Sequence, residues 1–178
     1  SVASINGHGG LEVGLAGKDA NLIVVRKAPG EVDLGFVGEV EEINPAILES
    51  LARDGFIPVI SSVAIGRGGE SYNINADAVA GDLAWRLGAE KPVLMTDVAG
   101  LLRAVNDPAS IISALTADEA AGLTSSGAVS KGMIPKVDAC VAAVKGGVKR
   151  AHIVDGRRPR ALLMEVFTDT GVGTMITQ

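Results

Sequence analysis

The stretch Tyr72-Asn73-Ile74-Asn75-Ala76-Asp77 decides the fold, because it joins the end of a short strand to the start of a helix. Apolar residues recur at helical spacing from Ala76 to Leu87, and this pattern predicts a helix there. Asn75 is the expected N-cap, and Asp77 falls in the first turn, where a carboxylate suits the helix dipole. Asn73 is then available for another role, unless all three polar residues serve only to cap the helix.

A second helix start is expected at Gly132-Met133-Ile134-Pro135-Lys136. Pro135 suits the first helical position, and Gly146-Gly147 marks the end of the helix. Lys136 then lies in the first turn, where the helix dipole disfavours a cation. Such a departure is expected where function sets the residue, since a lysine and a helix N-terminus directed at one point favour a polyphosphate. The alternative is a solvated surface lysine.

A third segment, Pro92 to Leu101, begins with an apolar run typical of a strand buried on both faces of a parallel sheet. Thr96 and Asp97 follow at the carboxyl end of this strand, where open α/β sheets bind ligands. Gly100 would let the backbone approach a ligand closely. The alternative is that Asp97 only forms a turn.

Strands and helices alternate along the chain, which predicts an α/β fold: a three-layer αβα sandwich with a mainly parallel sheet and an antiparallel addition near the N-terminus. We expect residues 1–178 to form a single domain. A hairpin tip is expected at 66–70. Strands are predicted at 13–15, 22–27, 35–40, 57–61, in the first half of 92–101 and at 151–154, and helices at 45–53, 76–87, from 116 and from 135.

Composition excludes several classes of function. A net charge of −5 without a long basic run argues against nucleic acid as a partner. No apolar run is long enough to span a membrane and no signal peptide is visible, so we expect a cytoplasmic protein. Cys140 lies on an apolar helix stripe and is expected in the core. His8 and His152 lack the neighbours of metal ligands, so no metal site is predicted. A basic cluster is expected to be solvated surface, although it could face a phosphate: Lys149, Arg150, Arg157, Arg158 and Arg160.

These segments, in this order, resemble the C-terminal half of the acetylglutamate kinase family, within the amino-acid kinase superfamily. The family transfers the γ-phosphoryl group of ATP to the side-chain carboxylate of N-acetyl-L-glutamate, a step of arginine biosynthesis. The similar segments are Val13 to Ile23, Gly35 to Val40, Ile57 to Ser61, Asn73 to Asp77, Thr96 to Leu101, Gly132 to Lys136, Phe167 to Asp169 and Gly171 to Thr174.

The resemblance implies a role for each matching residue. Asn73 would bind acetylglutamate, Asp77 would orient catalytic lysines, and Lys136 would neutralise charge on the transferred phosphoryl group. Mg-ATP would be the cofactor. The nucleotide pocket would be lined by Thr96, Asp97, Gly100, Leu101 and Met133. The chemistry is suitable, because a largely dissociative phosphoryl transfer needs positioning and positive charge rather than a protein nucleophile.

The resemblance also implies an arginine effector site and a homo-oligomer. Glu165 and Gly171 match positions that hold the effector in arginine-inhibited members, whereas Arg160 stands where those members often have a histidine. Family segments with a catalytic lysine, a glycine-rich phosphate loop and a substrate-binding arginine have no counterpart here. We therefore expect an incomplete enzyme whose N-terminal lobe is largely missing. A noncatalytic nucleotide- or arginine-binding module, or a related amino-acid kinase with another substrate, is the alternative.

Overall fold

The computed structural model describes residues 2–30, 32–103, 107, 110–168 and 171–178. Asp169 and Thr170 of the expected effector segment therefore lie outside the described residues. The chain forms two compact units, residues 1–79 and 80–178. The expectation that residues 1–178 form a single domain stays a prediction.

The first unit contains two small sheets. One is a parallel pair, β1 with β4, and the other has the order β3-β2-β5-β6. In the second sheet β2 pairs in parallel with β5, whereas the β2–β3 and β5–β6 pairs are antiparallel, which confirms the antiparallel addition. The elements are α1 (Val2–Asn6), β1 (Glu12–Ala16), a 3₁₀ helix (Asp19–Asn21), β2 (Ile23–Lys27), β3 (Gly38–Ile43), α2 (Ala46–Arg53), β4 (Ile57–Ser61), β5 (Val63–Gly66), β6 (Ser71–Asn73) and the start of α3 (Ala76–Arg86).

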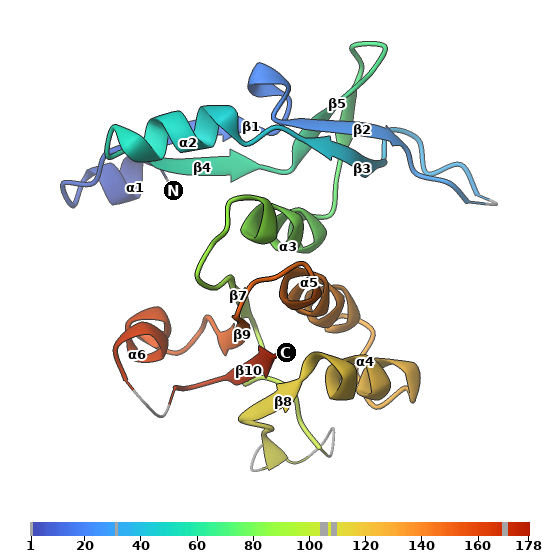
Figure 1. Ribbon diagram of the computed structural model, residues 1–178, viewed down its shortest axis with the longest axis vertical. Helices are drawn as coiled ribbons and strands as arrows, with labels where there is room; N and C mark the ends of the chain where they lie inside the picture. Colours follow the sequence, from blue (N-terminus) through green and yellow to red (C-terminus); the bar gives the residue numbers. More distant parts are fainter. Residues whose placement is uncertain (1, 31, 104–106, 108–109, 169–170) are drawn as a thin grey trace. The chain divides into compact units, whose positions relative to one another are not determined.

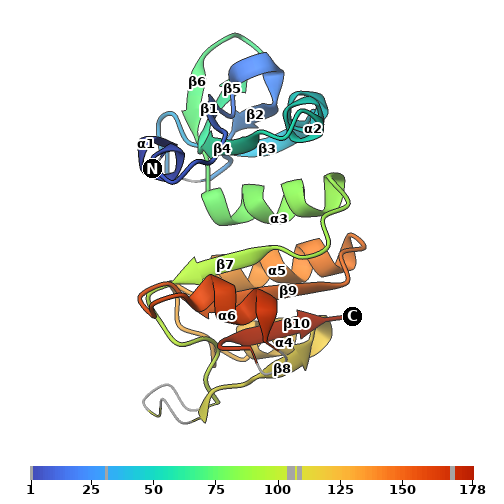
Figure 2. The ribbon, with the colours of Figure 1, turned by 90° about the vertical axis from the view of Figure 1, so that its left-hand side faces the viewer.

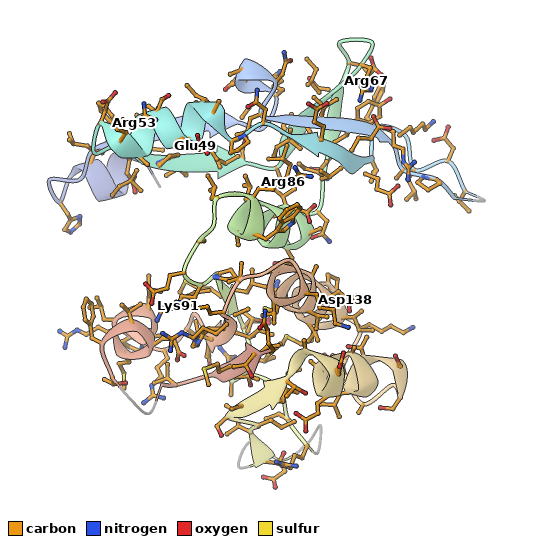
Figure 3. The ribbon with its side chains drawn as sticks, in the orientation of Figure 1. Glu49, Arg53, Arg67, Arg86, Lys91 and Asp138 are labelled. Atoms are coloured by element: carbon orange, nitrogen blue, oxygen red, sulfur yellow. The ribbon has the colours of Figure 1, made fainter. Side chains whose placement is uncertain are left out.

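Two turns of the first unit test the sequence prediction. The expected hairpin joins β5 to β6, and at its tip Arg67 forms ion pairs with Glu41 at 3.1 Å and Glu42 at 3.8 Å (Figure 3). The strand predicted at 35–40 instead runs from Gly38 to Ile43. Gly35 has a φ of +71°, and its N–H donates to Asp33 Oδ1 at 2.8 Å, so a turn occupies the predicted strand start.

The second unit is a mixed α/β layer structure. Its sheet has the order β7-β9-β10-β8, with parallel β7–β9 and β10–β8 pairs around an antiparallel β9–β10 pair. Helices α4 and α5 cover one face of the sheet and α6 lies on the other (Figures 1 and 2). This arrangement confirms the α/β class with helical layers on both sides. The elements are β7 (Val93–Thr96), β8 (Ala114–Thr116), α4 (Ala117–Ser125), α5 (Ile134–Lys145), β9 (Arg150–Asp155), α6 (Ala161–Phe167) and β10 (Thr174–Thr177).

The core of the second unit lies between α5 and the sheet. Val137, Cys140 and Val144 on α5 are fully buried together with Ile153 of β9 and Ile176 of β10. The prediction that Cys140 is a core residue is confirmed. Pro135 is the second residue of α5 rather than the first, because the helix already begins at Ile134.

The strand pairing differs from a single continuous sheet. Three separate sheets are present in the described part of the chain. Strands β8 and β10 were not predicted, because their three and four residues contain no long continuous apolar run. The capping box predicted at Thr116 is present: its hydroxyl accepts from the Glu119 N–H at 3.2 Å, and Glu119 Oε2 accepts from the Thr116 N–H at 2.7 Å.

Candidate functional site

The end of β6 and the start of α3 carry the first group of predicted site residues. The backbone N–H of Asn73 donates to the Phe36 carbonyl at 2.8 Å, and the Asn73 residue is exposed. Asn75 Oδ1 accepts from the N–H groups of Asp77 at 2.9 Å and Ala78 at 3.2 Å, so Asn75 is the N-cap, as predicted. Asp77 is half-buried in the first turn of α3.

The carboxyl end of β7 carries the second group. β7 and β9 run parallel, with Thr96 opposite Asp155, so both strands end at the same edge of the sheet. The Thr96 hydroxyl lies 3.6 Å from Met133 Sδ, although the two residues are 37 positions apart in sequence. The predicted nucleotide residues on the strand end and on the helix start are therefore neighbours in the structure.

A shallow, open cleft of about 500 Å³ lies at this edge, and we call it the polar cleft because charged side chains line it. Lys136, half-buried in the first turn of α5, lines the cleft together with Thr96 and Asp97. The other lining residues are Met95, Gly156 and Arg157. The cleft combines two cations, a hydroxyl and a carboxylate, which are the groups that a polyphosphate and its counter-ion require.

A second pocket, of about 270 Å³, is mostly apolar. Met133 lines it, and the Met133–Thr96 contact links it to the polar cleft. Predicted residues Gly100 and Leu101 also line this pocket, with Val98, Leu102, Ala128, Val129 and Ser130. An apolar pocket beside a polar cleft matches the division of a nucleotide into base and phosphates.

The wall formed by Gly100 and Leu101 is fixed by Thr174 at the start of β10. The Leu101 N–H donates to Thr174 Oγ1 at 2.9 Å, and Thr174 is fully buried. Gly100 has a φ of +146°, and a Cβ at this position would lie 2.6 Å from Thr174 Oγ1. Only glycine fits both the backbone conformation and the available space.

The second unit thus brings together six predicted site residues. They line the two linked cavities: Thr96, Asp97, Gly100, Leu101, Met133 and Lys136. Asn73 belongs to the first unit, and Asp77 lies in the first turn of α3, before the division at residues 79 and 80. Their roles toward substrate stay predictions. Within the described part of the chain, no group of three or more His, Cys, Asp or Glu residues could hold a metal ion.

A comparison with protein-family models matches residues 2–155 to the amino acid kinase family. The chain belongs to the amino acid kinase family. Among curated proteins, acetylglutamate kinase of Moorella thermoacetica is 50% identical over 98% of this chain and 62% of its own length. Acetylglutamate kinase of Nostoc sp. is 55% identical over 98% of this chain and 59% of its own length. The resemblance noted in the sequence is thereby confirmed, and the chain spans about three fifths of the length of these relatives.

Solved structures with a similar fold were also found. The N-acetylglutamate synthase of Neisseria gonorrhoeae, complexed with coenzyme A and N-acetyl-glutamate, superposes with a TM-score of 0.86 at 26% identity. The superposition covers 99% of this chain and 40% of that one. Aspartokinase III of E. coli, with a TM-score of 0.67 at 18% identity, shares the fold alone. None of the described helices of this chain is long and apolar enough to cross a membrane.

The segment after β9 was expected from the sequence to be solvated surface, with a phosphate-facing position as the alternative. In the structure, Arg157 lines the polar cleft. The end of β7 and the start of α5, which carry predicted site residues, line the same cleft. The sequence signal for this position was the place of the segment directly after a predicted strand. Gly156-Arg157 follows β9 as Asp97 follows β7, and parallel neighbours place such segments at one edge.

The residues predicted to hold arginine lie together on the second unit. A Cβ at Gly171 would lie 3.1 Å from both carboxylate oxygens of Glu165, so the carboxylate lies close beside the glycine. Glu165 is only 7% exposed, and its oxygens are already engaged: Oε1 contacts His152 Nδ1 and Oε2 accepts from the Val172 N–H at 2.7 Å. Burial lowers the pKa of His152, an effect that the nearby Glu165 carboxylate opposes.

Proposed function

We propose that this chain supplies the nucleotide-binding part of an acetylglutamate kinase, which phosphorylates the side-chain carboxylate of N-acetyl-L-glutamate to N-acetylglutamyl 5-phosphate. The observation that carries the proposal is the polar cleft, in which Thr96, Asp97 and Lys136 meet beside an apolar pocket. The relatives that are named acetylglutamate kinase and are 50–55% identical to the chain support the choice of substrate.

The two cavities would bind different parts of ATP. The apolar pocket beside Gly100 and Leu101 takes the base, because apolar walls exclude water from a flat aromatic ring. The polar cleft takes the phosphates, and Mg²⁺ would be held mainly by those phosphates, with Asp97 as the nearby carboxylate. Lys136 is placed to stabilise the charge that develops on the transferred phosphoryl group.

We assign substrate binding to the β6–α3 junction. The Asn73 backbone is held by the Phe36 carbonyl, and the exposed Asn73 side chain can offer both a donor and an acceptor to acetylglutamate. Asp77, on the first turn of α3, would orient catalytic lysines. In an enzyme that joins this chain to the remaining two fifths of its relatives, Asn73→Ala should chiefly raise KM for acetylglutamate.

The experiment that tests the proposal measures Mg-ATP binding to the chain by calorimetric titration. Lys136→Met should weaken ATP binding, whereas Lys131→Met should not, because exposed Lys131 lines neither cavity. In the joined enzyme, Lys136→Met should lower kcat by about 10²-fold. An ATP affinity that is equal in the wild type and both variants would contradict the phosphate assignment.

Turnover distinguishes a kinase from a noncatalytic nucleotide-binding module. We expect the chain of residues 1–178 to bind Mg-ATP weakly without forming acyl phosphate, because the family's lysine and glycine-rich phosphate loop have no counterpart in it. Trapping with hydroxylamine detects the acyl phosphate. Acetylglutamate-dependent hydroxamate from the chain alone would contradict this expectation, and its absence from the joined enzyme would favour the module.

We also propose that Glu165 and Gly171 form part of an arginine effector site. Their proximity supports the assignment, since a carboxylate beside a glycine loop can hold a guanidinium. Arginine would have to displace the contact of Glu165 with His152 or with Val172, so we expect weak binding to this chain. Arginine should inhibit the joined enzyme, so arginine titration of that enzyme and of its Glu165→Ala variant tests the assignment, and sedimentation tests the expected homo-oligomer. Equal arginine affinity in both proteins would remove Glu165 from the site.

A further inference from the structure

Arg157 lies at the edge of the sheet where the proposed phosphates would bind. It follows β9 by two residues, and the preceding Gly156 donates its N–H to the Thr96 carbonyl at 2.8 Å. This bond ties the segment after β9 to the end of β7. The open cleft at this edge is lined by both Arg157 and Lys136.

Asp155 holds the Arg157 side chain in one orientation. Arg157 Nε donates to Asp155 Oδ1 and Arg157 Nη2 donates to Asp155 Oδ2, both at 2.9 Å. The hydrogen bonds from Arg157 lower the pKa of Asp155, and the same pair raises the pKa of Arg157. A two-point pair fixes the plane of the guanidinium, so less side-chain freedom is lost when a further ligand binds.

The guanidinium retains the capacity to bind an anion. Of its five N–H donors, two are directed to Asp155, which leaves about three for a ligand. The Arg157 side chain is 66% exposed, so a ligand in the cleft can reach it. The turn itself does not require this side chain, because the Arg157 backbone N–H already donates to Asp155 Oδ1 at 3.0 Å.

We propose that Arg157, oriented by Asp155, is a second phosphate-binding cation of the nucleotide site and acts beside Lys136. This inference rests on the proposed function, and it adds a residue outside the segment, 2–155, that matches the amino acid kinase family. An acidic chain with a net charge of −5 repels a polyphosphate at long range. Two cations converging on one cleft offset that repulsion where the phosphates bind, and Arg157 contributes directional hydrogen bonds that a lysine cannot make.

The test is a calorimetric titration of the chain with Mg-ATP and, separately, with adenosine. Arg157→Ala should weaken ATP binding by roughly tenfold, because hydrogen bonds to a charged group are lost. Adenosine affinity should change less than about twofold, because adenosine has no phosphate for Arg157 to bind. Arg158→Ala is the matched control, since Arg158 is exposed and does not line the cleft, and it should leave both affinities unchanged.

Two more variants separate binding from folding and from the proposed function. Arg157→Lys keeps the charge but loses the two-point pair, so its ATP affinity should fall between the wild type and Arg157→Ala. Equal losses for ATP and adenosine in Arg157→Ala would show a structural role and overturn the inference. If Lys136→Met weakens ATP binding and Arg157→Ala does not, only the assignment of Arg157 is overturned. If the wild type binds no ATP, the proposed function and this inference are both overturned.

Discussion

The buried bond between Thr174 and Leu101 allows a quantitative prediction for Thr174→Val. Valine has nearly the same shape as threonine but cannot accept the Leu101 N–H, which lies 2.9 Å from Thr174 Oγ1 in a fully buried position. Leaving a buried donor unsatisfied costs about 1–3 kcal/mol. A 1 kcal/mol loss lowers the Tm of a chain of this size by roughly 2–4 °C, so the expected decrease is about 2–12 °C.

The assay combines denaturant unfolding with amide hydrogen exchange. Thr174→Ser is the control, because it keeps the acceptor and loses only one buried methyl group, a loss of about 1 kcal/mol. The Leu101 amide should lose protection in Thr174→Val and keep it in Thr174→Ser. The reasoning is refuted if Thr174→Val unfolds within about 0.5 kcal/mol of the wild type and its Leu101 amide stays protected.

Three further predictions concern stability. The pKa of buried His152 is lowered, so this histidine binds a proton more readily in the unfolded chain than in the folded one. The free energy of unfolding should therefore fall as pH drops below the ordinary histidine pKa of 6.5. Chemical denaturation across pH checks this, and His152→Asn should flatten the dependence. Thr116→Ala removes the cap of α4 and should cost about 1 kcal/mol by denaturant titration, with Thr116→Ser close to the wild type. If residues 1–178 fold as one domain, fluorescence of Trp85, the single tryptophan, and far-ultraviolet circular dichroism should report the same melting transition; separated transitions would mean that the two units unfold independently.

Local signals in the sequence predicted helix starts accurately. Asn75 caps α3 and Thr116 forms a capping box, because each interaction involves residues two or three positions apart. A strand ending near Thr96 and a strand at 151–154 were predicted from apolar runs, and the structure pairs them in parallel as β7 and β9. Residues close together in the sequence determine each cap and each strand, so the local sequence is sufficient to predict them.

Long-range pairing was harder to predict. The position of β10 between β9 and β8 depends on which strand edges remain open after the rest of the unit has folded. The alternation of buried Thr174 and Ile176 with half-buried Met175 and Thr177 is a short signal, and four residues are too few to distinguish a strand from a loop. Gly35 shows a related limit, because its left-handed conformation moved the start of β3 by three residues.

In the candidate site, too, some features could be predicted from the sequence and others could not. The proximity of Thr96 to Met133 was expected from family resemblance, and the structure brings these residues together. The cleft position of Arg157 was only the alternative, because a cluster of basic residues near the surface usually stays solvated. Its orientation depends on Asp155, and a sequence pattern does not reveal whether an aspartate two residues away turns an arginine into a cleft or along the surface.

The place of β10 in the second sheet has a consequence for how the protein is made. Until Thr177 has left the ribosome, β8 has no strand partner in the described sheet, and β9 can pair only with β7. Thr174, which fixes the pocket wall at Gly100 and Leu101, arrives in the same segment. Folding of this unit therefore waits for a contact between residues more than seventy positions apart, which is a slow event compared with helix formation. The proposed nucleotide pocket is completed only at that step, so a nascent chain that lacks β10 should lack the formed pocket that we assign to the base of ATP.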